Sequence, residues 1–186
     1  MEDISRSLGL SIPSTRVFCS RKTKSGEFIR ARRDLYILSE AFKQWDERDY
    51  FILANVIQTP SYVSLTTALS YYELTTQLVP TLIESINPIR SDTYEVERIR
   101  FQYHFSQSKN YFGYEKKEGF FIAQPEKALL DSLYLLWLGR YALDENALHL
   151  KTIQWIQIEK WLEGYSERFK KFVKDWKKIH AHSPTT

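Results

Sequence analysis

The chain has 186 residues, 43% of them hydrophobic, and a formal net charge of only +3; this composition excludes a disordered chain and allows one large or two small domains. No apolar run approaches the roughly 20 residues of a membrane-spanning helix, and the acidic start, Met1-Glu2-Asp3, is not typical of a signal peptide. Cys19 is the only cysteine, so an internal disulfide and a cysteine-based zinc site are excluded and a cytoplasmic location is expected.

Charge is distributed unevenly along the chain. Met1–Leu38 holds eight Lys/Arg against four Asp/Glu, and the segment from Ser166 to the end holds six against two, whereas the middle holds 12 against 17. Seven basic residues lie between Arg16 and Arg33, against the single acid Glu27. This cluster predicts an anionic partner at the N-terminal end, while the basic C-terminal end is interpreted as a solvated helix face.

The first elements follow the order helix, turn, helix, hairpin. Caps, turn residues and apolar spacing predict a helix over Asp3–Leu8, a second helix from Ser11 to Ser25, and strands over Glu27–Arg30 and Leu35–Leu38. Pro13 suits the start of the second helix, and Gly26 suits the left-handed cap that ends it. This order predicts a reduced winged helix-turn-helix over residues 1–40, with a domain boundary between Glu40 and Asp46.

In a winged helix the second helix enters the major groove, and the wing meets phosphates or the minor groove. Arginine, lysine, serine and threonine side chains make such contacts. The residues predicted to bind DNA are Ser14, Thr15, Arg16, Ser20, Arg21 and Lys22 on the second helix, and Arg30, Arg32 and Arg33 on the wing. The residues predicted to form the core of this part are Ile12, Val17, Phe18, Cys19, Phe28, Ile29 and Tyr36.

The second part, residues 46–180, is predicted to be α+β, with a small sheet and a helical C-terminus. Its expected helices are Tyr50–Gln58, Leu65–Tyr72 with Ser64 as N-cap, Glu126–Leu138, and Ile153–Ile179 broken at Gly164. Its expected strands are Tyr62-Val63, Leu82–Ile86, Ile99–Phe105 and Phe120–Ala123. Alternation in the third strand turns His104 outward and predicts that it is exposed. Residues 181–186 are predicted to form a frayed tail.

Glu126, Lys127 and Asp131 invite a comparison with metal-dependent nucleases, in which carboxylates hold the metal that activates water. A further carboxylate from a neighbouring strand would be needed, and none is evident. The preferred interpretation is structural: Glu126 complements the helix dipole, and Lys127 and Asp131 pair on the surface at i and i+4. The chain has no Gly-rich phosphate loop, so no enzyme activity, cofactor or metal is expected.

Two segments carry a family resemblance: Pro60–Leu69, with the sequence PSYVSLTTAL, and Ala123–Asp131, with the sequence AQPEKALLD. Together with the intervening Phe112-Gly113-Tyr114, they resemble the signature segments of the AbiEi-like antitoxins of bacterial type IV toxin–antitoxin systems. The resemblance runs from about Ile4 to about Leu138. It implies an N-terminal winged helix that represses the operon and a C-terminal α+β antitoxin domain.

The resemblance also implies partners. These are double-stranded operator DNA and a nucleotidyltransferase-like toxin encoded beside the antitoxin, which need not form a stable complex with it. The matching residues look structural, so no toxin-contact residue is carried over.

Two features depart from the family pattern. Only about ten residues precede Ser11, so the helix that normally begins a winged helix is missing, and Asp34 stands where the wing usually carries glycine. Either the true start lies upstream of Met1 or the winged helix is reduced and needs a partner, such as a second copy in a homodimer. The alternative function is a protein-interaction module with a remnant winged helix that no longer binds DNA.

Overall fold

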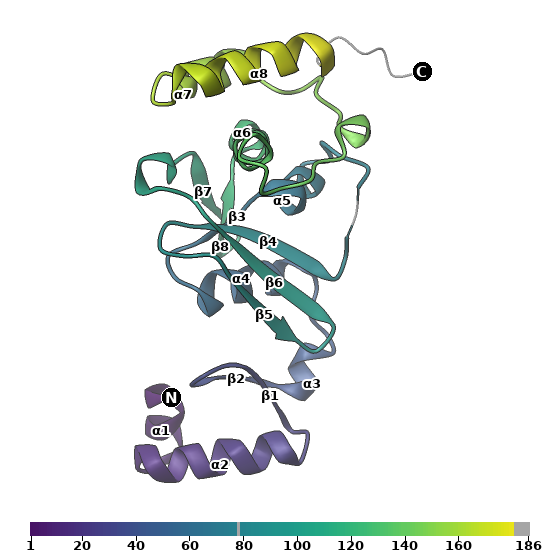
Figure 1. Cartoon of the computed structure of the whole chain (residues 1–186). Coiled ribbons are helices and arrows are strands. Elements are labelled where there is room, and N and C mark those ends of the chain that lie inside the picture. The colour runs from purple at the N-terminus through teal and green to yellow at the C-terminus, as the bar shows by residue number, and fades with distance from the viewer. Residues whose placement is uncertain (78, 181–186) are drawn as a thin grey trace.

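The computed structural model describes residues 1–77 and 79–180, which form a mixed α+β fold (Figure 1). The predicted frayed tail, residues 181–186, lies outside the described residues. The helices are α1 (Glu2–Leu8), α2 (Ile12–Lys24), α3 (Ser39–Phe42), α4 (Glu47–Ile57), α5 (Leu65–Tyr71), α6 (Pro125–Trp137), α7 (Trp155–Leu162) and α8 (Glu167–His180), with 3₁₀ turns η1 (Ser108–Asn110) and η2 (Glu145–Ala147). Within the described ranges, no helix combines the length and apolarity that crossing a membrane requires.

The strands form two sheets. A two-stranded antiparallel hairpin consists of β1 (Phe28–Arg32) and β2 (Leu35–Leu38). The second sheet has six strands in the order β5-β6-β4-β3-β8-β7, and they are β3 (Tyr62–Val63), β4 (Leu82–Asn87), β5 (Asp92–Val96), β6 (Ile99–Phe105), β7 (Tyr114–Lys117) and β8 (Phe120–Ala123). The β4–β6 and β3–β8 pairs are parallel and the other pairs are antiparallel.

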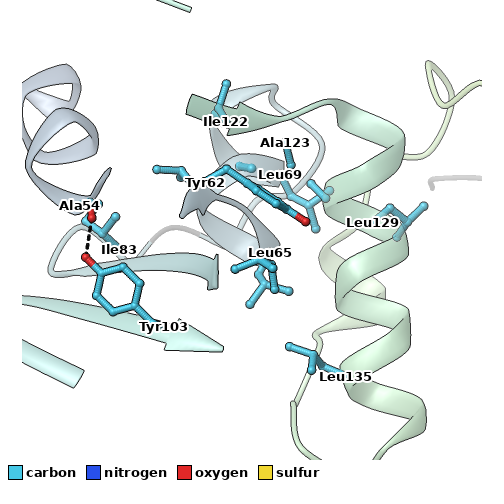
Figure 2. Close-up of a cluster of buried hydrophobic side chains, with 14 of the residues drawn as sticks. Ala54, Tyr62, Leu65, Leu69, Ile83, Tyr103, Ile122, Ala123, Leu129 and Leu135 are labelled. Atoms are coloured by element: carbon cyan, nitrogen blue, oxygen red, sulfur yellow. Dashed lines mark hydrogen bonds between the residues drawn. The ribbon is translucent and has the colours of Figure 1, made fainter. Parts of the chain in front are cut away.

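Helices cover both faces of the six-stranded sheet (Figure 1). The Tyr103 hydroxyl donates a 2.6 Å hydrogen bond to the carbonyl of Ala54 in α4, which fixes α4 on one face (Figure 2). On the other face, Leu65 and Leu69 of α5 and Leu129 of α6 are fully buried. Since α7 and α8 cover α6 in turn, the apolar α6 is enclosed within the chain itself.

Most predicted elements are confirmed. The break of the last helix at Gly164 is correct, because α7 ends at Leu162 and α8 begins at Glu167. Strands β5 and β7 were not predicted; both lie at sheet edges, where all but one of their side chains are partly or fully exposed and the apolar pattern is weak. The predicted exposure of His104 is wrong, since this side of β6 is covered and His104 is only 9% exposed.

Two residues of α6, Lys127 and Asp131, form an ion pair inside the fold. Lys127 donates to Asp131 Oδ1, and Asp131 Oδ2 accepts hydrogen bonds from the Tyr62 hydroxyl at 3.0 Å and the Ser64 hydroxyl at 2.9 Å. Lys127 is 0% and Asp131 3% exposed. The predicted pairing is therefore confirmed, whereas its predicted position on the surface is wrong. Ser64 does precede α5, but its hydroxyl binds Asp131 and makes no hydrogen bond to the helix backbone.

The environment of this pair opposes charge on both partners. Burial lowers the pKa of Lys127 and raises that of Asp131, while each charge opposes the shift of the other. Gly113, at φ +69°, closes over the lysine, since a Cβ there would lie 3.1 Å from Lys127 Cγ and Cδ. Because a buried charge is costly when it is alone, removing one partner is expected to cost far more than removing both.

This expectation can be measured with a double-mutant cycle. Asp131→Asn leaves the ammonium group of Lys127 buried without a counter-ion, and Lys127→Met leaves the carboxylate of Asp131 in the same state. Each variant should lose about 3–5 kcal/mol of unfolding free energy in urea titrations, and the double variant should lose clearly less than the sum. Additive losses would show that the two groups do not stabilise each other.

Candidate nucleic-acid interface

Residues 1–40 are called the head. Local hydrogen bonds cap both ends of its second helix, α2. At its start, the Ser11 side chain accepts a hydrogen bond from the Ser14 amide at 3.4 Å. At its end, Gly26 takes φ +79°, and the Glu27 amide donates to the carbonyl of Lys22 at 3.0 Å. These caps and the turn between α1 and α2 confirm the predicted element order.

The hairpin of the head lies between α2 and the body, residues 46–180 (Figure 1). On the side facing α2, the ring of Phe28 contacts the rings of Phe18 and Tyr36, with centroids 6.1 and 6.3 Å away. On the side facing the body, Ala31 is 5% exposed and belongs to the same buried cluster as the body's core residues. The head therefore rests on β5 through its hairpin.

One face of α2 points away from the hairpin and remains open to solvent. Of the predicted DNA-binding residues of α2, Ser14, Arg16, Ser20 and Arg21 are exposed. Thr15 is 0% exposed, and its hydroxyl donates to the carbonyl of Ser11 at 2.9 Å, so its prediction as a DNA contact is wrong. Thr15 therefore lies on the covered side of α2, as does Cys19 about one turn later.

The open face also contains residues whose exposure was not predicted from the sequence. Val17, predicted to be core, is 52% exposed, so that prediction is wrong, whereas the predicted burial of Cys19 is confirmed. Lys24 is exposed on the same face as Arg21. The helical spacing of Val17, Arg21 and Lys24, at intervals of four and three residues, was the signal that could have identified this face.

The three wing arginines differ in their surroundings. Arg30 is exposed, and the Arg33 side chain is 81% exposed beside Asp34 at the tip of the hairpin. Arg32, although exposed, donates to the carbonyl of Val56 in α4 at 3.5 Å. The structure therefore brings Arg32 to the body, while Arg30 and Arg33 remain open to an anionic ligand.

Ion pairs occupy part of the basic cluster. Lys22 lies 2.6 Å from Glu27, and Arg16 lies 3.9 Å from Asp34. Its hydrogen bond to Lys22 lowers the pKa of Glu27, so this carboxylate is ionised at neutral pH. Exposed ion pairs of this kind contribute little to stability, and phosphate groups can replace the carboxylates as partners of these cations.

A left-handed residue and one hydrogen bond define the tip of the hairpin. Asp34 adopts φ +63°, the left-handed conformation for which glycine is usual. The Met1 ammonium group donates to the carbonyl of Asp34 at 3.1 Å, which ties the start of α1 to the tip. Asp34 thus fills the position where the resembled family usually has glycine, and it places a negative charge beside Arg16 and Arg33.

Over the described ranges, no cluster of three or more His, Cys, Asp or Glu side chains could hold a metal ion. Comparisons of the chain with protein-family models, with curated proteins and with solved structures gave no match. Its function is therefore inferred from the geometry of the chain and from the resemblance of its sequence.

The charge of Asp34 and its left-handed backbone conformation have effects that two substitutions can measure independently. Asp34→Asn keeps a residue that tolerates the left-handed conformation but removes the charge, so stability should change little and binding to duplex DNA at low salt should tighten. Asp34→Ala should tighten binding similarly but lower the unfolding free energy by about 1 kcal/mol. Binding can be followed by fluorescence anisotropy; unchanged affinity in both variants would mean that this part of the hairpin lies away from DNA.

Proposed function

We propose that this chain is the antitoxin of a type IV toxin–antitoxin pair. In this proposal the head is a reduced winged helix that binds operator DNA and represses the operon, and the body neutralises a nucleotidyltransferase-like toxin. The two activities occupy different parts of one chain. No catalytic step is assigned to either part.

The open face of α2 is the observation that carries the DNA-binding half of the proposal. Arg21 and Lys24 lie there without an acidic partner among the described residues, and Arg30 and Arg33 are exposed on the hairpin. Together these four residues can contact phosphates, and the neighbouring serines Ser14 and Ser20 offer short polar contacts to phosphates or bases.

The contacts among the resembling segments support the architecture on which the antitoxin half of the proposal rests. Tyr62 and Ser64 from the first segment bind Asp131 from the last, and Gly113 from the middle one lies against Lys127. All three segments therefore meet at one buried ion pair. Residues with such a role maintain a fold, which is why the likeness to the AbiEi-like antitoxins supports the architecture of the body and assigns no toxin contact.

The DNA-binding proposal is tested with the combined variant Arg21→Ala, Lys24→Ala, Arg30→Ala and Arg33→Ala. Each lost phosphate contact should reduce the slope of log K against log salt concentration by about 1, so the variant should lose about 3 to 4 from the slope on upstream operon DNA. The measurement is a titration of labelled duplex at several salt concentrations.

A matched control removes four cations from the opposite end of the molecule, where α8 lies (Figure 1). The control is the combined variant Arg168→Ala, Lys171→Ala, Lys174→Ala and Lys178→Ala, whose residues are all exposed. It changes the net charge equally and should leave the salt slope unchanged. If both variants lose affinity equally, general charge rather than the head attracts DNA.

The antitoxin proposal is tested by growth rescue, with the chain and the product of the adjacent gene expressed from unrelated promoters. The wild-type chain and the four-residue head variant should both restore growth, because neutralisation is assigned to the body. Point variants are preferable to removal of residues 1–40, since that would uncover the body surface that Ala31 covers. If the wild-type chain fails to restore growth, the antitoxin assignment is wrong for this pair.

Exposed apolar side chains on the head favour the alternative, a protein-interaction module. Leu8, Leu10, Val17 and Leu38 are between 38% and 58% exposed. In the alternative a protein partner covers these side chains; in the main proposal a second copy of the chain covers Leu8, Leu10 and Leu38 in a DNA-bound homodimer, while Val17 stays on the open face of α2 that meets DNA. Sedimentation of the chain with and without duplex DNA distinguishes the two, because only the homodimer forms without another protein.

A further inference from the structure

A pocket of about 780 Å³ lies in the body, away from the open face of α2. Its walls come from β4 and the residues before it, β6, α5, the segment after α6, the turn between α3 and α4, and the first turn of α4. This volume falls within the usual range of small-molecule sites, about 300–1,000 Å³. Glu84 lines the pocket but is only 3% exposed, so its carboxylate lies at the base.

The carboxylate of Glu84 is held in place by a chain of hydrogen bonds. The Tyr141 hydroxyl donates to Glu84 Oε2 at 2.8 Å, and the Tyr141 oxygen accepts from the Thr66 amide at 3.3 Å. Burial and the charge of Glu84 raise the pKa of Tyr141, so its hydroxyl keeps its proton at neutral pH. One carboxylate oxygen is thus bound, and Oε1 has no hydrogen bond within the described residues.

His104 lies beside this oxygen but does not form a hydrogen bond with it. Its Nε2 lies 3.4 Å from Glu84 Oε1, but the geometry is not that of a hydrogen bond, and Nε2 is buried without any hydrogen-bond partner. This histidine is the one ion-pairing group beside Glu84 in the described part of the chain, and it carries a charge only when protonated; no lysine or arginine pairs with Glu84 there. A buried carboxylate is normally paired, so this arrangement leaves room for a cation supplied from outside.

Backbone strain supports a functional role for this base. Leu65, the first residue of α5, is fully buried and has φ +56°, which is costly for a residue with a bulky side chain. The bend at Leu65 directs the amide of Thr66 to Tyr141, and Tyr141 in turn directs its proton to Glu84. Strain of this kind persists where the surrounding structure requires a particular placement.

The other charged groups of the pocket indicate the ligand's chemistry. Asp46 and Glu47 line it together with Trp45 and Tyr50, so that with Glu84 the lining holds three carboxylates and two guanidinium groups, those of Arg98 and Arg140. Burial and the neighbouring charge of Asp46 raise the pKa of Glu47, as expected where two acids lie close without a cation. Both arginines are exposed.

We propose that this pocket binds an aliphatic polyamine, with one ammonium group on Glu84 and the methylene chain along the apolar wall. An ammonium group has donors and no acceptor, which matches the free carboxylate oxygen at the base. Glu47 lines the same pocket with a neighbouring carboxylate and two aromatic rings, and we assign it to a second ammonium group because carboxylates and rings both attract cations. The proposal goes beyond the proposed function and does not depend on DNA or toxin binding.

The probe is spermidine, added to the full chain without DNA. At about one hundred times its Kd it should raise the Tm by roughly 5–10 °C, and calorimetry should give one site. Glu84→Gln keeps an oxygen that accepts the Tyr141 proton but removes the charge, so binding should weaken at least tenfold. Glu47→Gln, an exposed change, should weaken binding of spermidine by a smaller factor.

The controls distinguish a specific binding site from nonspecific electrostatic attraction of spermidine. Glu163→Gln removes an exposed carboxylate outside this pocket and should bind spermidine like the wild type. Magnesium chloride at equal ionic strength should not raise the Tm in the same way. If spermidine does not bind, or binds Glu84→Gln equally well, the proposal is wrong; if ATP binds instead and Arg98→Ala abolishes it, the pocket takes an anion.

The stability of Glu84→Gln without ligand distinguishes a binding role from a structural one. If the role of the Glu84 carboxylate is to bind a ligand cation, its buried charge destabilises the free protein. Removing that charge should then leave the Tm of the free protein equal or raise it. If Glu84 serves only to pair with His104, the Tm should fall and spermidine should not affect the wild type. That second result would overturn the proposal even though the variant folds.

Discussion

The buried pair of Lys127 and Asp131 is the interaction on which the body depends. It joins α6 to β3 and to the residue after β3 through the hydroxyls of Tyr62 and Ser64, and Gly113 brings the segment before β7 against the lysine. Charged groups at this depth are stable only when each hydrogen bond is made. The pair therefore fixes the relative positions of three segments far apart in the sequence, which are the segments that resemble the AbiEi-like antitoxins.

The hairpin has the corresponding role for the head. Its two faces pack on α2 and on the body, so the open face of α2 has a fixed orientation relative to the six-stranded sheet. The basic surface of the head, the pocket above Glu84 and the amphipathic α8 thus belong to one framework.

Some of this arrangement could be predicted from the sequence because the signal is local. The caps of α2 and the break of the last helix at Gly164 arise from neighbouring residues, and both were confirmed. The alternation along β6 holds only from Ile99 to Tyr103, since His104 is buried and Phe105 is exposed. The edge strands β5 and β7 were missed because they acquire their conformation by pairing with β6 and β8 rather than from an apolar pattern of their own. Thr15 and His104 were misassigned because helical and strand periodicity cannot say what covers the second face of an element.

The sequence by itself determined the mixed α+β class, the order of elements in the head and the basic character of α2, since composition, caps and periodicity are properties of adjacent residues. Only the tertiary structure decided that Lys127 and Asp131 are buried, that Arg32 binds the body, and that Glu84, Tyr141 and Thr66 meet at one pocket. The physical reason is that burial and pairing of charges depend on groups brought together by folding, whose distance along the chain carries no information about their distance in space.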